Sequence, residues 1–174
     1  MSQSGDPKVT RIIGVDPGLN TTGYGVIDVD QLGRFTLCEA GIVRSRPKDP
    51  LQTRLGEIHE GISEVIADHK PTLMALEQLF SHYERPRTAI LMGHARGVIA
   101  LAAHNAGISI SHFEPTRVKK VMTGNGRAPK SQIQLAVKIQ LGLESIPEPS
   151  DVADALAIAL CGYHLGNESP LGKM

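Results

Sequence analysis

Short apolar runs separated by turn residues open the chain and predict consecutive β-strands. Such runs cover residues 12–15 and 22–27, with Pro17-Gly18 between them, and another covers residues 35–43 after a turn signal at 30–33. Runs of this length between Pro, Gly and Asp residues are typical of strands joined by tight turns. These strands are expected to pair as an antiparallel meander.

Helical spacing follows the meander. Residues 51–66 carry apolar side chains at positions 51, 55, 58, 62, 65 and 66, which is the pattern of an amphipathic helix. Residues 73–76 are continuously apolar, as expected of a strand covered on both faces in a mixed sheet. Residues 88–106 are apolar around much of a helical circumference, so this helix is expected to be buried on more than one side.

The rest of the chain adds one strand and further helices. Residues 108–113 alternate like a strand, and residues 116–122, 129–141 and 151–164 have helical patterns. The order βββαβαβααα predicts an α/β fold in which helices cover both faces of one sheet. We expect a single domain over residues 11–164, with flexible tails at 1–10 and 165–174.

Composition says more about the compartment than about the chemistry. The 174 residues suffice for one packed core, and a formal net charge of zero is compatible with a local basic face. The chain has no run near the roughly 20 apolar residues that cross a bilayer and no secretion signal, so a cytoplasmic protein without a membrane partner is expected. Cys38 and Cys161 lack metal-binding spacing and are expected to be buried thiols.

Acidic residues stand where predicted strands end. Asp16 closes an apolar run directly before the Pro17-Gly18 turn, where aspartate is also common for purely structural reasons. Glu77 extends the buried run at 73–76, so its carboxylate needs a cation, hydrogen-bond donors or an ion-pair partner. Neither acid alone decides between a structural and a functional role.

Two more acids lie on the last predicted helix. Asp151 and Asp154 are three residues apart and therefore share one side of it. Ser150 as N-cap and the helix dipole would explain Asp151, but that explanation weakens by Asp154. Neighbouring carboxylates repel each other, and a shared divalent cation is the simplest stabiliser. With Asp16 and Glu77 they supply the oxygen-rich cluster that two Mg²⁺ or Mn²⁺ ions require for phosphodiester cleavage by an activated water.

A segment without acids runs from residue 115 to 143. A solvated basic face is the structural explanation of its charge. Lys130 favours another, because it stands in the first turn of a predicted helix, where a cation opposes the helix dipole and free amides favour an anion. A DNA phosphate would satisfy both. The residues predicted to bind DNA here are Arg117, Lys119, Lys120, Arg127 and Lys130.

Phe80 stands three residues after Glu77 in a chain with few aromatic residues. Core packing is one explanation of its position. Stacking on an unpaired base beside a metal site is the other, and it adds Phe80 to the predicted DNA-binding residues.

Small residues recur along the helix predicted at 88–106, where they would let another helix approach closely. They are Gly93, Ala95, Gly97, Ala100 and Ala103. Packing within the monomer explains part of this pattern, and the remainder suggests a two-fold homodimer interface.

Five blocks of sequence, in matching order and spacing, resemble the RuvC-type Holliday-junction resolvases. They are IIGVDPGLNTTGYGVI at 12–27, ALEQLF at 75–80, GHARGVIALAA at 93–103, PTRVKKVMTGNGRAPKSQIQ at 115–134 and DVADALAIAL at 151–160. DPG or DxxDA alone would be a weak signal, but the blocks together are specific and span nearly the whole chain. Departures are His94, where Gln is common, a slightly expanded loop at 82–87, and Asp151, where some similar proteins have His.

The resemblance implies an RNase H-like fold with a five-stranded mixed sheet. It implies a metal-dependent endonuclease that resolves Holliday junctions in recombination and repair, through paired symmetric nicks in two like-polarity strands of four-way junction DNA. A homodimer and the RuvA–RuvB branch-migration complex are the implied partners. The implied metal ligands are Asp16, Glu77, Asp151 and Asp154, and the implied DNA contacts near them are Lys119, Lys130 and Phe80.

Two other classes of function remain open. Actin-like and sugar-kinase-like ATPases also begin with a β-hairpin carrying Asp-x-Gly, but they normally contain two related domains, and this chain has no second Asp-x-Gly hairpin. A non-catalytic junction-binding module would keep the basic segment but has no reason to retain all the carboxylates. Incubating junction DNA with Mg²⁺ separates these classes.

Overall fold

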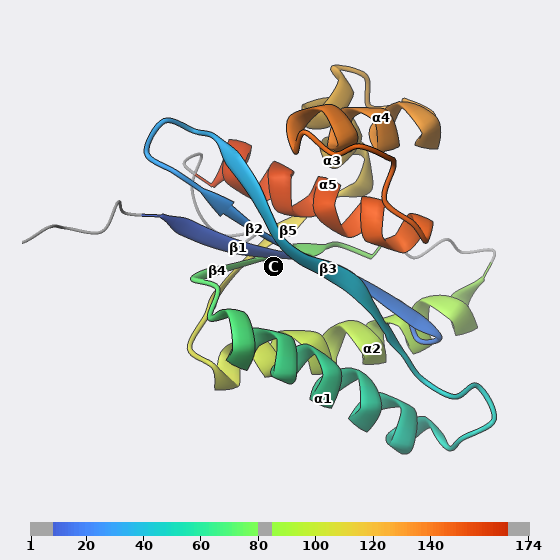
Figure 1. The fold of residues 1–174 in the computed structure, drawn as a ribbon. Helices are drawn as coiled ribbons and strands as arrows, with labels where there is room; N and C mark the ends of the chain where they lie inside the picture. The colour runs from blue at the N-terminus through green and yellow to red at the C-terminus, as the bar shows by residue number, and fades with distance from the viewer. Residues whose placement is uncertain (1–8, 80–84, 167–174) are drawn as a thin grey trace, which may run out of the picture.

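The computed structural model describes residues 9–79 and 85–166 (Figure 1). Its strands are β1 (Thr10–Asp16), β2 (Thr21–Val29), β3 (Phe35–Arg44), β4 (Leu73–Glu77) and β5 (Ser109–Phe113). Its helices are α1 (Leu51–His69), α2 (Pro86–Asn105), α3 (Pro115–Thr123), α4 (Lys130–Gln140) and α5 (Ser150–Leu165). The predicted order of elements is confirmed. Phe80, part of the loop at 82–87 and most of both predicted tails lie outside the described residues.

The strands form one mixed sheet of five strands in the order β3-β2-β1-β4-β5. β1, β2 and β3 pair antiparallel as the expected meander, whereas β1, β4 and β5 run parallel. Asp16 lies opposite Gly23 of β2, and Val15 lies beside Leu76 of β4. The carboxyl ends of β1 and β4 therefore meet at one edge of the sheet, where Asp16 and Glu77 are the last strand residues.

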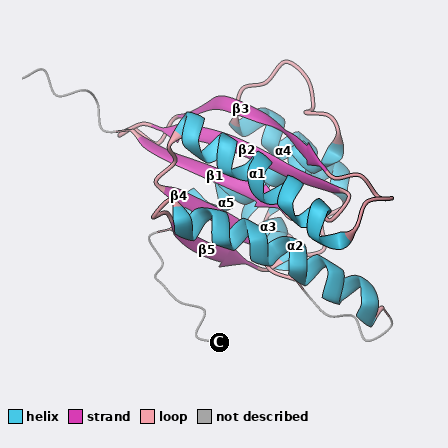
Figure 2. Ribbon diagram, turned by 90° about the horizontal axis from the view of Figure 1, so that it is seen from below, coloured by secondary structure: helices cyan, strands magenta, loops and turns pink. Residues whose placement is uncertain are grey.

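Helices cover both faces of the sheet, as the order of elements predicts. α1 and α2 lie on one face, and α3, α4 and α5 lie on the other (Figure 1, Figure 2). Because successive side chains of a strand point to opposite faces, Ile13 and Val15 pack toward α1 and α2, whereas Ile12 packs toward α5. Asp16 follows Ile12 at an even spacing, so its carboxylate belongs to the α5 face.

Glycines in the sheet let α5 lie directly on the strands. A Cβ atom at Gly14 would lie 2.2 Å from the carbonyl oxygen of Ala155, and one at Gly23 would lie 2.2 Å from that of Asp151. Real Cβ atoms do not approach backbone oxygens so closely, so only glycine allows this packing. Since Gly23 is the strand neighbour of Asp16, the first turn of α5 is seated beside the end of β1.

The prediction that the helix at 88–106 is buried on more than one side is wrong for this chain. α2 buries one face, formed by Ala95, Ile99, Ala102 and Ala103. On its other side Ile90 is 63% exposed and Leu101 is 49% exposed. A continuous apolar pattern cannot distinguish burial within the chain from a face that only another molecule could cover.

Two local expectations also need correction. α5 begins at Ser150 itself with Pro149 at the N-cap, so Ser150 has a helical backbone and does not cap the helix. Cys161 is buried as expected, but Cys38 is only half-buried, because the edge strand β3 leaves it partly open to solvent. Among the helices that the structure describes, none has the length and apolar character that a membrane span requires.

Candidate active site

Asp16 and Glu77 form the centre of the candidate site. They end adjacent parallel strands, and their carboxyl groups lie close enough for each to shift the pKa of the other. Glu77 follows Ala75, which packs on the α5 side, at an even spacing, so both carboxylates lie under α5. Glu77 is partly buried beside another acid, and the cations expected for its carboxylate are Lys119 and Lys130.

The pKa values of this pair are raised by burial and by neighbouring negative charges. Burial, and after it the neighbouring carboxylates of Glu77, Asp154 and Asp151, together raise the pKa of Asp16 to about 8. Burial also raises the pKa of Glu77, an effect that Asp16 and the nearby cations Lys119 and Lys130 oppose. The predicted carboxylates therefore act on one another, although they come from three separate segments.

Asp154 reaches the site from the second turn of α5 and has a cation as its partner. Its Oδ2 lies 2.9 Å from the Nζ of Lys130, the first residue of α4. This contact raises the pKa of Lys130. The predicted first-turn position of Lys130 is confirmed, and its charge is directed at the carboxylate cluster.

All four predicted ligands offer carboxylate oxygens, which are the donors that a hard divalent cation requires. They also lie close together, since Glu77, Asp151 and Asp154 each raise the pKa of Asp16. In the described part of the chain, however, no three acidic, histidine or cysteine side chains converge closely enough to hold a metal ion. Within the cluster, Asp16 lies beside Glu77, and Asp154 pairs with Lys130.

The structure divides the predicted DNA-binding residues into two groups. Lys119 and Lys130 lie near Glu77 at the carboxylate cluster. Arg117 and Lys120 instead line a hollow of about 650 Å³ that also includes Leu165, at the opposite end of α5 from Asp151. Arg127 lies in the α3–α4 connection, where Asn125 accepts a hydrogen bond from its backbone.

Comparisons with known proteins identify the family. The sequence model described as crossover junction endodeoxyribonuclease RuvC matches residues 12–162. The RuvC of Rhodopirellula baltica is 70% identical over 156 residues, which cover 90% of this chain and 87% of that protein. The chain belongs to the RuvC family.

Solved RuvC structures share the fold. The Thermus thermophilus RuvC structure is 34% identical with a TM-score of 0.84, covering 91% of this chain and 96% of that one. T. thermophilus RuvC in complex with Holliday junction substrate is 31% identical with a TM-score of 0.83, covering 92% and 97% of the two chains. The RNase H-like fold that the resemblance implied is thereby confirmed.

Sequence reasoning missed Arg44, a cation at the same edge of this RuvC-family sheet. Arg44 ends β3 opposite Thr21 and follows Ile42, which packs on the α5 side, at an even spacing. Two strand spacings, or roughly 10 Å, separate β3 from β1. Nothing local distinguishes Arg44 in the sequence, because only the register of three strands places it near Asp16.

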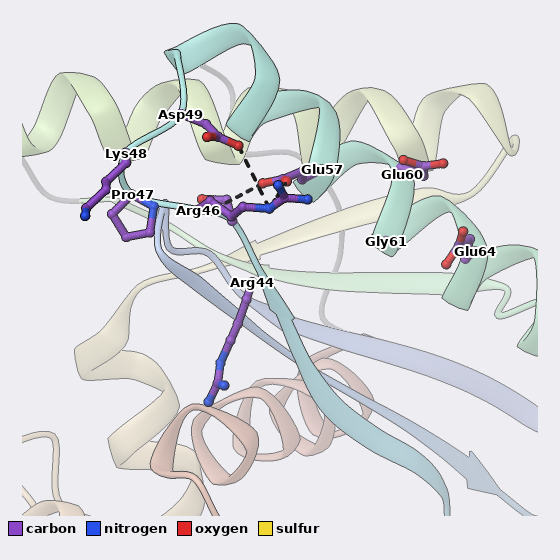
Figure 3. Close-up of a pocket in the computed structure, with 10 residues that line it drawn as sticks. Arg44, Arg46, Pro47, Lys48, Asp49, Glu57, Glu60, Gly61 and Glu64 are labelled. Carbon is purple, nitrogen blue, oxygen red and sulfur yellow. Dashed lines mark hydrogen bonds and ion pairs between the residues drawn. The ribbon is translucent and has the colours of Figure 1, made fainter.

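Arg44 and Arg46 differ in the charged side chains that surround them (Figure 3). A hollow of about 870 Å³ lies between the β3–α1 connection and α1, and Glu57 on α1 contacts Arg46 at 3.5 Å. Arg44 also lines this hollow, but its side chain points away from Asp49 and Glu57 (Figure 3). No hydrogen bond or ion pair joins Arg44 to another described residue. Arg46 therefore has acidic partners at this surface, whereas Arg44 pairs with none of the described residues.

Sequence reasoning also missed Arg96, within the GHARG block. Its Nε donates to the backbone carbonyl of Glu77 at 3.0 Å, and its Nη2 donates to Nδ1 of His112. The sequence offered only the block itself as a signal, since no spacing rule connects α2 with the end of β4.

Proposed function

We propose that this RuvC-family protein resolves four-way DNA junctions by metal-dependent hydrolysis, through paired symmetric nicks in two like-polarity strands. The observation that carries the proposal is the meeting of Asp16 and Glu77 under the first turns of α5, in a chain 70% identical to a RuvC. A junction-binding module would have no reason to gather this many partly buried like charges, whose repulsion costs stability. The clustering of the carboxylates at one site therefore favours an endonuclease over a junction-binding module.

We propose Asp16, Glu77, Asp151 and Asp154 as catalytic residues and as ligands of two Mg²⁺ ions, with Mn²⁺ as a substitute. Such ions, when bound, activate a water and stabilise the leaving 3′ oxygen. The protein's own part is positional: two rigid strand ends and one helix hold the carboxylates in fixed places. Lys130 balances the charge of Asp154 before DNA arrives and can transfer its contact to a phosphate.

The DNA backbone is proposed to contact the lysine and arginine side chains that lie around the carboxylate cluster. Lys119 and Lys130 lie beside Glu77, and Arg44 lies across the sheet from them on the same face. Arg117, Lys120 and Arg127 would contact the junction further away. Backbone contacts of this kind fix the position of the DNA without reading its sequence. Phe80 is proposed to stack on an unpaired base, although it lies outside the described residues.

A homodimer is proposed through the outer face of α2. Ile90 and Leu101 are exposed there, and a Cβ built at Gly93 or Gly97 meets no atom within 4 Å. These residues recur at helical spacing, so they form one stripe of small and apolar groups. A stripe of this kind suits a close helix–helix contact around a two-fold axis, and paired scissile strands require two active sites.

Gly97→Arg is expected to convert the dimer to a monomer, because a long cation would stand in the middle of the stripe. Sedimentation velocity should then report about half the mass of the parent protein. Gly56→Arg is the matched variant, since a Cβ at Gly56 on α1 also meets no atom within 4 Å. A Gly97→Arg protein that remains dimeric would exclude this face.

The RuvA–RuvB branch-migration complex is proposed as the partner, and the cytoplasm as the compartment. Both follow from membership of the family.

The function is tested on a synthetic four-way junction with labelled strands. In Mg²⁺, denaturing gels should show nicks at matching positions in two opposed strands, while linear duplex of the same sequence stays intact. Chelation of the metal should abolish the nicks. Binding without nicks at any Mg²⁺ or Mn²⁺ concentration would leave a junction-binding module, and ATP hydrolysis without junction cleavage would favour the ATPase class.

A further inference from the structure

Arg96 joins α2 to the end of the strand that carries Glu77. Its Nε donates to the Glu77 carbonyl at 3.0 Å, and its guanidinium also donates to the ring of His112 on β5. The Glu77 carbonyl is a neutral acceptor, and burial, together with the charge of Arg96, lowers the pKa of His112, which favours its neutral ring. The contact is therefore not an ion pair, and its geometry is set by directed hydrogen bonds.

This contact lies where β1 stops pairing with β4, while β5 still pairs with Glu77 through Phe113. The parallel pairing of β1 with β4 ends at Val15 and Leu76, one residue before Glu77. On the other side, the backbone of Gln78 still bonds to Phe113 of β5 at 2.8 Å. Glu77 thus lies past its last β1 partner, and Arg96 supplies the hydrogen bond to its carbonyl.

We propose that Arg96 is a positioning residue for the metal ligand Glu77. By holding the main chain of Glu77 from the α2 side of the sheet, it fixes where the side chain emerges on the α5 side. The inference rests on the proposed function, since it assigns a purpose to the placement of a proposed ligand. It also ties that ligand to α2, the helix proposed for the dimer contact.

A purely structural arginine is the competing explanation, and the chain contains a comparison for it. Arg11 donates its Nη1 to the carbonyl of His69 at 2.8 Å and pairs with Asp28 at 2.7 Å. Arg11 lies near the start of β1, five positions before Asp16 and at the opposite end of the strand. Both arginines donate a hydrogen bond to a backbone carbonyl. Of the two, Arg96 is the one whose acceptor belongs to a residue of the candidate site.

The test measures metal binding directly as well as nicking. Mn²⁺ is titrated into the full-length protein, and free Mn²⁺ is followed by its electron paramagnetic resonance signal. Outer contacts that orient a metal ligand are typically worth about 10- to 100-fold in metal affinity or activity. Arg96→Met is therefore expected to weaken Mn²⁺ binding at least about tenfold and to raise the Mn²⁺ needed for half-maximal nicking by a similar factor.

Two further variants keep the result interpretable. Arg96→Lys keeps a donor in reach of the Glu77 carbonyl and is expected to recover much of the Mn²⁺ affinity lost in Arg96→Met. Arg11→Met is expected to lower the melting temperature and to leave Mn²⁺ affinity unchanged. If Arg96→Met lowers only the melting temperature, as Arg11→Met does, Arg96 is a structural residue and the inference fails.

The failure of the proposed function has a different signature. If the parent protein binds no Mn²⁺ and nicks no junction, the function itself is wrong. If the parent binds Mn²⁺ and nicks while a folded Arg96→Met protein matches it in both, only the role of Arg96 is wrong.

Discussion

Replacing Asp154 with asparagine is expected to reduce junction nicking by about a thousandfold, which corresponds to about 4 kcal/mol of lost transition-state stabilisation. Asparagine keeps the shape of the side chain but removes the negative charge proposed to hold a cation. Denaturing gels of a labelled junction measure the loss. Junction binding, measured at the same salt concentration by gel shift, should stay within about threefold of the parent, because the surrounding cations are untouched.

The contact of Asp154 with Lys130 makes this prediction more specific. The Lys130 side chain is 54% exposed, so losing the ion pair should cost little stability. The released Lys130 remains available to a phosphate. Asp30→Asn is the matched variant, because Asp30 also pairs with a cation, Arg34, but lies in the β2–β3 turn. Asp30→Asn should nick normally, and normal nicking by Asp154→Asn would remove Asp154 from the site.

Gly23→Ala is expected to reduce nicking by about a hundredfold, although Gly23 carries no chemical group. The new Cβ would lie 2.2 Å from the carbonyl oxygen of Asp151, so the first turn of α5 must move. A displacement of about 1 Å in a catalytic group can cost a hundredfold in rate. Overpacking of this kind also costs about 1 to 3 kcal/mol of stability, which thermal unfolding would detect.

Gly56→Ala supplies the comparison for this second prediction. Gly56 lies on α1, and a Cβ there meets no atom within 4 Å. Alanine in an open helical position should stabilise the protein by up to about 1 kcal/mol and leave nicking unchanged. The distinguishing result is the ratio of nicking to folded protein, which should fall for Gly23→Ala alone. An active Gly23→Ala protein would show that α5 tolerates the shift.

Local sequence patterns determined the elements of this protein and most of its candidate chemistry. Strand and helix periodicities are set by residues a few positions apart, and turns are marked by Pro, Gly and Asp, so the element order could be predicted. The same short-range patterns predicted Asp16 and Glu77 at strand ends and Asp151 beside Asp154 on one helix face. Their roles as metal ligands stay a prediction.

Only the tertiary structure decided which of these groups meet. Asp16 and Glu77 are adjacent because β1 pairs with β4, and Asp154 joins them because Gly14 and Gly23 let α5 rest on the sheet. Likewise, pairing alone brings Arg44 to this edge, and packing alone brings Arg96 to Glu77. Such contacts depend on strand order and register, which no local window of sequence contains. The apolar surface of α2 has the same origin, since hydrophobicity is a property of residues, whereas burial is a property of what surrounds them.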